Sequence, residues 1–482
     1  MQKKFITNLA LLILLNFLIK PFWLFGIETK VQRDMVSPED YGIYFTLFNF
    51  SMLFNILLDV GITNFNNKNI AQHKQLLTKY LSGIVSFKFV LAAVYFLVTF
   101  AAGYFAGYDS GRFYLLLFLS INQFLISFIQ YLRSNIAGLQ LFALDSLLSV
   151  LDKSLMIIFC AVLIWGNILE AKFEIIHFVY AQTLAYVITL LVVFGTVLAK
   201  TSQFKLKLNK PFSLMILKQT YPYALLVLTM MFYYRVDVIM LDMMLEDGEV
   251  QAAIYAQAYR LMDAANQVGV LFAALLLPMF ANMIQHNKSA EGLVKLSFSL
   301  IFLPAIAVAI FCFFFSNDIM ELIYNSHIEE SANVLGMLMF CFVAIASTYI
   351  FGTLLTANGS LKTLNQLAIG GVLINFILNL VLIPALKAEG SALASLITQI
   401  LIVIAQILVM KKVFSFRTNF KFIGVLIIYI LLLLGAIYQV GILFTGFFIQ
   451  LLIFAFISLL LGLALRIFSL KEIRDILRGK QA

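Results

Sequence analysis

The stretch from Lys218 to Gly269 constrains the fold most, because it places charged residues inside two long apolar runs. Each run is long enough to cross a bilayer, since about 20 helical residues, at about 1.5 Å rise each, span the hydrocarbon core. A short acidic turn, Glu246 to Glu249, separates them. Charges at membrane depth are costly, so we expect these side chains to face a protein interior or a water-filled cavity. The charged residues inside the two runs are Arg235, Asp237, Arg260 and Asp263.

The composition extends this interpretation to the whole chain. Of 482 residues, 62% are hydrophobic and 12% are charged, and the mean hydropathy is +0.99. A soluble domain carries roughly 25% charged residues. The chain is therefore predicted to be an all-α polytopic membrane protein. The first apolar run, Leu9 to Ile27, lacks a small-residue cleavage site and is interpreted as a retained membrane span.

The apolar runs predict fourteen transmembrane helices. Their expected ranges are 6–27, 41–64, 80–106, 113–134, 143–165, 173–199, 214–243, 251–281, 295–316, 331–356, 364–386, 389–410, 420–439 and 445–467. The connections are short, and the longest is a basic stretch between the sixth and seventh spans. No connection is long enough for a catalytic domain, so we expect the protein not to be an enzyme and to use no cofactor.

Lysine and arginine set the expected orientation. With the N-terminus inside, 23 of them fall on the cytoplasmic side and five in outer loops. This asymmetry predicts that both termini are cytoplasmic and that the number of spans is even. Because the basic residues lie beside apolar spans, the net charge of +9 indicates a membrane partner and not nucleic acid. A monomer is expected.

Weak internal similarity suggests a repeat. Gly42-Ile43-Tyr44 aligns with Ala253-Ile254-Tyr255 at an offset of 211, and Ala71-Gln72-His73 then nearly aligns with Ile284-Gln285-His286. Repeated bundles with a midplane site are a transporter architecture. We therefore expect two pseudo-symmetric six-helix lobes around a central cavity, 1–205 and 206–412. Residues 413–482 would form two extra helices and a basic cytoplasmic tail.

Several motifs, taken together and in order, resemble a known family: the polysaccharide (O-antigen, Wzx-type) flippases of the multidrug/oligosaccharidyl-lipid/polysaccharide (MOP) exporter superfamily. The motifs are Pro222…Arg235-x-Asp237…Tyr255-x-x-Ala258-x-Arg260, Ser37-Pro38-Glu39-Asp40-Tyr41-Gly42, Leu58-Asp59-Val60-Gly61 and Asn375…Asn379…Ile383-Pro384…Glu389-Gly390. The resemblance implies alternating access and the flipping of an undecaprenyl-pyrophosphate-linked oligosaccharide across the bacterial inner membrane. The joint from Ile383 to Gly390 departs from the family, in which many members have a shorter, glycine-rich joint.

Five basic residues fall inside predicted spans and are candidates for an anion-binding cavity: Lys20, Lys88, Lys153, Arg235 and Arg260. Arginine suits phosphate through bidentate hydrogen bonds, whereas lysine acts as a point charge. Purely structural roles are equally compatible with the spacing. Arg260 can pair with Asp263, Lys153 can pair with Asp145 or Asp152, and Lys88 or Lys153 can extend towards the cytoplasm.

Carboxylates and prolines inside the spans are weaker candidates. Asp237 and Asp263 are expected to pair with bases or bind a coupling Na⁺ or H⁺. Pro21 and Pro222 are expected either to kink their helices or to act as hinges. The cysteines and histidines lack metal-ligand spacing, so no metal site is expected.

Two further functions compete with glycan flipping. A multidrug or cation antiporter of the same superfamily would have an acidic or apolar cavity, whereas five bases inside the spans favour an anion. A membrane glycosyl polymerase or ligase would need a sizeable outer loop for its catalytic groups.

Overall fold

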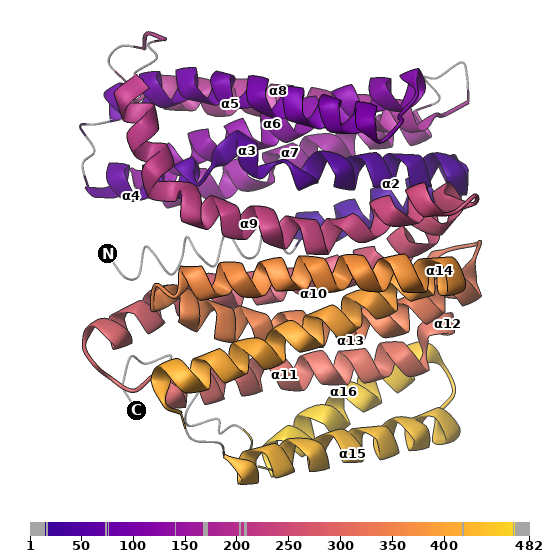
Figure 1. Cartoon of the computed structure of the whole chain (residues 1–482). Coiled ribbons are helices and arrows are strands. Elements are labelled where there is room, and N and C mark those ends of the chain that lie inside the picture. The colour runs from indigo at the N-terminus through magenta and orange to yellow at the C-terminus, as the bar shows by residue number, and fades with distance from the viewer. Residues whose placement is uncertain are drawn as a thin grey trace. The chain divides into compact units, whose positions relative to one another are not determined.

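A computed structural model of the chain describes residues 15, 18–72, 75, 77–139, 141–166, 172–201, 204–206, 210–416, 419–465 and 467 (Figure 1). The regular elements of these residues are helices. Ten of the helices in this described part are long and apolar enough to cross a membrane. The predicted fold class, an all-α polytopic membrane protein, is confirmed.

The chain forms two compact units, Met1–Ala253 and Ile254–Ala482. The predicted boundary between the two lobes, at residue 205, rests on the sequence repeat, and it stays a prediction. In the contacts of the first unit, helix α9 (Lys210–Met244) packs along helix α2 (Pro38–Leu53).

The first unit holds most of the predicted spans up to the seventh. Its remaining helices are η1 (Phe22–Glu28), η2 (Val31–Met35), α3 (Ile56–Asp59), α4 (Ile62–Gln72), α5 (Leu77–Phe105), α6 (Ser110–Gly138), α7 (Phe142–Trp165) and α8 (Ile175–Leu198). Helix α6 is the central element, because it packs against α2, α4 and α8. It is also the helix that brings the polar residues described below into the interior.

The predicted start of the second span is confirmed. The Ser37 hydroxyl accepts a hydrogen bond from the backbone N–H of Asp40 at 3.1 Å, and Pro38 is the first residue of α2. Serine before a first-turn proline is a favourable helix start. Four residues further on, Gly42 leaves room for another backbone, since a Cβ there would lie 1.8 Å from the Glu249 carbonyl oxygen.

The second span is not the single helix that its apolar run predicts. It is broken into α2, α3 and α4, and the chain turns at Val60 and Gly61, whose φ angles are 46° and 80°. Glycine adopts such angles at little cost, but a β-branched valine does so rarely. The break therefore needs support from the surrounding structure.

The second unit is built around a buried helix, α13 (Ile328–Ala357), which packs against α11 (Glu291–Phe314) and α14 (Leu361–Phe414). The other helices of this unit are α10 (Gly248–Gln285, from Ile254 on), α12 (Ser316–Ile323), α15 (Phe420–Leu443) and α16 (Phe447–Ala464). The last two pack on α11, and the Tyr429 and Ser458 hydroxyl groups join them at 2.8 Å.

Helix α14 contains the eleventh and twelfth predicted spans. Lys387 interrupts it with φ 51° and ψ −130°, at the predicted boundary between residues 386 and 389. The turn is so tight that a Cβ on Gly390 would lie 2.3 Å from the Leu382 carbonyl oxygen. Each predicted span from the second to the fourteenth thus overlaps a described helix or one half of α14.

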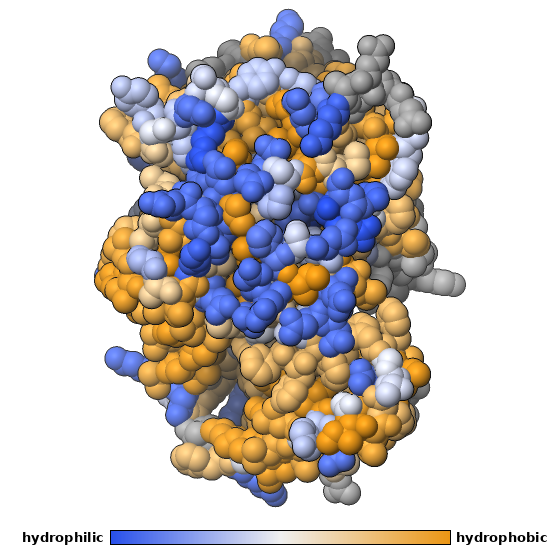
Figure 2. All heavy atoms as spheres, turned by 90° about the vertical axis from the view of Figure 1, so that its right-hand side faces the viewer, coloured by the Kyte–Doolittle hydropathy of each residue, from blue (hydrophilic) through white to orange (hydrophobic). Residues whose placement is uncertain are grey.

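The surface agrees with a membrane environment. Large apolar side chains are exposed along the flanks of the helices, including Leu97, Leu191, Leu431 and Leu452. Figure 2 looks onto one set of helix ends and shows hydrophilic side chains gathered there. Apolar flanks with polar ends are what a bundle surrounded by lipid requires.

Candidate functional site

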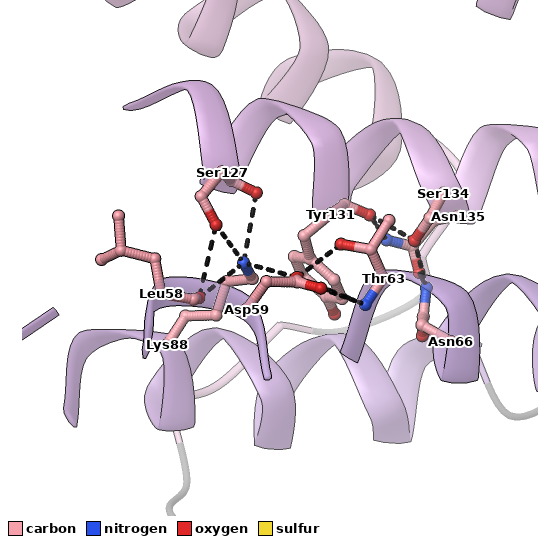
Figure 3. Close-up of polar contacts among 9 residues, drawn as sticks. All are labelled: Leu58, Asp59, Thr63, Asn66, Lys88, Ser127, Tyr131, Ser134 and Asn135. Carbon is pink, nitrogen blue, oxygen red and sulfur yellow. Dashed lines mark hydrogen bonds and ion pairs between the residues drawn. The ribbon is translucent and has the colours of Figure 1, made fainter. Parts of the chain in front are cut away.

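Lys88 lies on α5 in the interior of the first unit, with its side chain 2% exposed. Its ammonium group donates to the Leu58 carbonyl at 3.0 Å, and to the carbonyl and hydroxyl oxygens of Ser127 at 3.1 and 2.8 Å. It also forms an ion pair with Asp59 at 3.1 Å (Figure 3). Four oxygens therefore surround this buried charge, one of them a carboxylate.

Asp59 serves two elements at once. Besides pairing with Lys88, its carboxylate accepts hydrogen bonds from the Thr63 hydroxyl at 2.5 Å and from the Thr63 backbone N–H at 3.3 Å. Thr63 is in the first turn of α4, where backbone N–H groups lack helical partners. Asp59 thus caps α4 across the break and compensates the charge of Lys88.

A polar layer continues from this group along α6. The Asn66 amide donates to the Ser134 hydroxyl at 2.9 Å and to the Asn135 side-chain oxygen at 3.0 Å (Figure 3). All three side chains are buried. Because buried polar groups need hydrogen-bond partners, these contacts fix α4 against α6.

Lys153 lies on α7 in a different environment. Its ammonium group is 3.3 Å from the Tyr186 hydroxyl and 3.5 Å from the Met156 sulfur. It also lies over the Trp23 ring at 5.2 Å and the Tyr186 ring at 5.5 Å. The side chain is half-buried, and these contacting groups are all neutral.

Lys20 comes close to this group. It is exposed, one residue before Pro21, and its charge interacts unfavourably with that of Lys153 and favourably with that of Asp152. Asp152 also interacts with Lys153, whereas Asp145 pairs with Arg133 at 2.9 Å. Of the two carboxylates considered for Lys153 in the sequence, Asp145 is therefore engaged elsewhere.

The remaining candidates are divided between the units. In the first unit, Arg235 is half-buried on α9 and donates to the Asn49 side-chain oxygen at 3.0 Å, and Asp237 on the same helix is 1% exposed. In the second unit, Arg260 is 4% exposed on α10, and the charge of Asp263 interacts with Tyr349. The expected anion site between the two arginines stays a prediction.

The hinge candidates have helical surroundings. Pro21 precedes η1 with φ −63° and ψ −37°, and Pro222 lies within α9. Whether either residue moves stays a prediction. Among the described residues no cluster of three or more potential metal-ligating side chains occurs.

The sequence did not single out an ionic cluster at the turn between α9 and α10. Arg112 at the start of α6 contacts Asp242 at 2.6 Å and Glu249 at 2.8 Å. These residues line an open pocket of about 430 Å³ together with Tyr108 and Asp109. Their wide separation in sequence, 130 and 137 residues, gave no signal by which to pair them.

Comparisons with known proteins agree with this architecture. The chain matches the family model described as "Polysaccharide biosynthesis protein" over residues 8–284, which is more than half of its length. A search of curated proteins found no match.

Solved structures share the fold at low sequence identity. The lipid II flippase MurJ in an inward closed conformation aligns with a TM-score of 0.72 at 16% identity, covering 94% of this chain and 98% of that one. An inward-facing multidrug resistance MATE family transporter aligns with a TM-score of 0.64 at 16% identity, covering 81% and 94%. A MOP superfamily transporter from Pyrococcus furiosus aligns with a TM-score of 0.62 at 15% identity, covering 85% and 95%.

The solved structures that share this fold are described as a flippase and as transporters. The family match includes Lys20, Lys88, Lys153, Arg235 and Arg260. The chain is a member of the polysaccharide biosynthesis protein family, with the fold of the MOP superfamily transporters.

Proposed function

We propose that the protein flips an undecaprenyl-pyrophosphate-linked oligosaccharide across the bacterial inner membrane by alternating access. The family match and the likeness to a lipid II flippase support this class of substrate. The observation that carries the proposal is the group formed by Lys153 and Lys20 in the first unit. The charges of Lys20 and Lys153 oppose each other and share the nearby charge of Asp152, so a substrate anion would add to that compensation.

The contacts of Lys153 suit a group that binds and then releases an anion. Its ammonium rests against a phenol, a thioether and two aromatic faces. A cation–π contact contributes only about 0.5–2 kcal/mol. A pyrophosphate oxygen offers a charge-assisted hydrogen bond, roughly twice as strong as a neutral one. The substrate would compete for Lys153 with the charges of Asp152 and Glu28, with which no salt bridge to Lys153 forms among the described residues.

The test is export in a bacterial strain that depends on this protein for its surface glycan. We expect Lys153→Ala to reduce surface glycan about 10- to 100-fold, because a hydrogen bond to a charged group is worth about 1.5–3 kcal/mol. The lipid-linked precursor should accumulate, and protein abundance should stay near wild type.

A matched control is Lys295→Ala. Lys295 is also a lysine on a membrane helix with its ammonium over an aromatic ring, that of Phe422 at 5.3 Å, but it is exposed. The Lys295→Ala variant should export surface glycan at the wild-type level. Normal export by Lys153→Ala and Lys20→Ala at wild-type abundance would remove the basis for this site.

Arg235 and Arg260 are the second part of the proposal. Replacing either with alanine should abolish export without lowering abundance, and lysine should rescue partly, by charge without bidentate hydrogen bonding. If both alanine variants export normally, the arginines have structural roles. The substrate site then has to lie around the lysines alone.

The proposed orientation places both termini on the cytoplasmic side of the membrane. The protein would act as a monomer, driven by Na⁺ or H⁺. The first 14 residues and residues 468–482 lie outside the described part of the chain. Reporter fusions at the C-terminus and within residues 246–249 should report opposite sides of the membrane. Finding both reporters on one side would overturn the orientation.

A further inference from the structure

We propose that the oxygens around Lys88 form a cage for a monovalent cation of ammonium size, and that the Lys88 side chain supplies the resident cation. The cage consists of the Leu58 and Ser127 carbonyl oxygens, the Ser127 hydroxyl and the Asp59 carboxylate. This role is distinct from substrate binding, and it does not depend on the proposed function.

The dimensions of the cage fit an ammonium group. Its four oxygens lie 2.8–3.1 Å from the Lys88 nitrogen. These lengths match charge-assisted N–H···O bonds, and they exceed the roughly 2.0–2.6 Å at which oxygens bind Mg²⁺ or Ca²⁺. Carbonyl oxygens combined in this way also replace the hydration shell of potassium in channels. The ligands that would suit the empty cage are therefore ammonium and potassium ions.

The cage exists because the second span is broken. In a continuous helix the Leu58 carbonyl would accept the N–H of the residue four positions later. Here the chain leaves the helix at Val60, and the Leu58 carbonyl receives the Lys88 ammonium and, at 3.3 Å, the Ser127 hydroxyl. The carbonyl end of α3 carries partial negative charge, which favours a cation.

The Lys88 ammonium in turn stabilises the break between α3 and α4. Val60 occupies a backbone conformation that β-branched residues rarely adopt, and such a conformation persists only where surrounding contacts enforce it. Lys88 joins α3 to α5 and α6, while Asp59 joins α3 to α4. Lys88 is thus a positioning residue. Because its ammonium group is covalently attached and already occupies the four oxygens, soluble cations cannot enter the cage.

The experiment measures the thermal unfolding of purified Lys88→Ala and wild-type protein in four chloride salts of equal ionic strength: ammonium, potassium, sodium and choline. Alanine removes the resident cation and leaves the oxygens in place. Ammonium and potassium should raise the Tm of the variant by about 5 °C over choline, in a saturable way. The wild type should show no such difference.

Three variants sharpen the result. Lys88→Met fills the space with an apolar chain and should not respond to cations. Lys88→Ala with Asp59→Asn should lose the response, because the carboxylate charge is gone. Lys153→Ala, a matched loss of a lysine with neutral contacts in the same unit, should show none. An equal Tm of Lys88→Ala in all four salts, or a response no larger than that of the wild type, would overturn the proposal.

Protein abundance decides the matter if Lys88→Ala fails to accumulate. The double variant Lys88→Ala/Asp59→Asn should then accumulate to a higher level, since it no longer leaves the half-buried Asp59 carboxylate uncompensated. If the double variant accumulates no better than the single one, charge compensation in the cage is refuted.

Discussion

Lys88 and Lys153 lie in the same compact unit but hold their charges in different ways. Lys88 is enclosed by four oxygens, including the Asp59 carboxylate, whereas Lys153 rests on a phenol, a thioether and aromatic faces. The first arrangement leaves no vacant donor direction for a substrate, because an ammonium group has three protons. The second has no salt bridge among the described residues, and we expect it to bind the anionic substrate. A lysine inside a membrane span is therefore either part of the framework or part of a binding site, and its contacts distinguish the two.

The largest effect should come from Lys88→Met. Removing one partner of a fully buried ion pair destabilises a protein by about 3–5 kcal/mol, because the other charge is left uncompensated. Asp59 is 23% exposed, so the loss here should fall below that range but still exceed those of the two changes that follow. We expect low abundance and a lowered Tm, with the loss in export following the loss of protein. Adding Asp59→Asn should restore part of the Tm. If Lys88→Met instead lost export at normal Tm and abundance, Lys88 would have a substrate-binding role like the one proposed for Lys153.

An intermediate effect should come from Ser127→Ala, which removes one hydroxyl from the Lys88 cage. The Ser127 hydroxyl is 2.8 Å from the ammonium, and a hydrogen bond to a charged group contributes about 1.5–3 kcal/mol to the free energy of unfolding. Thermal unfolding in detergent should show a clearly lowered Tm. The export activity per molecule should stay near wild type, and a specific loss of export at unchanged Tm would contradict the framework role.

The smallest effect on stability should come from the matched change next to Lys153. Tyr186→Phe removes a hydroxyl 3.3 Å from the ammonium but keeps the aromatic ring beneath it. This bond is longer and its site is half-buried, so it should contribute less than a close hydrogen bond to a charged group, which is worth about 1.5–3 kcal/mol. We expect a Tm close to wild type and a change in export of a few-fold. A drop in Tm as large as that of Ser127→Ala would erase the distinction between the two lysines.

Regular features of the second span were predictable from sequence, but its break was not. Ser37 and Pro38 predict a helix start through local chemistry, and the structure has it there. The break at Val60 runs against local preference, since a β-branched residue disfavours that conformation, although Gly61 and the mostly polar residues after it are compatible with a break. It is stabilised by Lys88, 30 residues further along the chain from Leu58, and such pairings follow from tertiary packing.

The candidate site likewise has features that were predictable from the sequence and features that were not. Charge inside apolar runs identified the five basic residues, because bilayer energetics make such residues unusual. Their partners were not evident from sequence. Spacing along one helix allows Asp145 to pair with Lys153, but Arg133 from the preceding helix binds it at 2.9 Å. Proximity in sequence suggests a partner, and helix packing decides between competitors.

The turn at Lys387 bears on how the protein enters the membrane. The two halves of α14 are joined through a single residue with non-helical angles, and Gly390 packs against the Leu382 backbone. Because the connection is this short, one half cannot span the bilayer while the other half remains outside it. We therefore expect the two halves to integrate together as a helical hairpin with Lys387 and Glu389 at its tip.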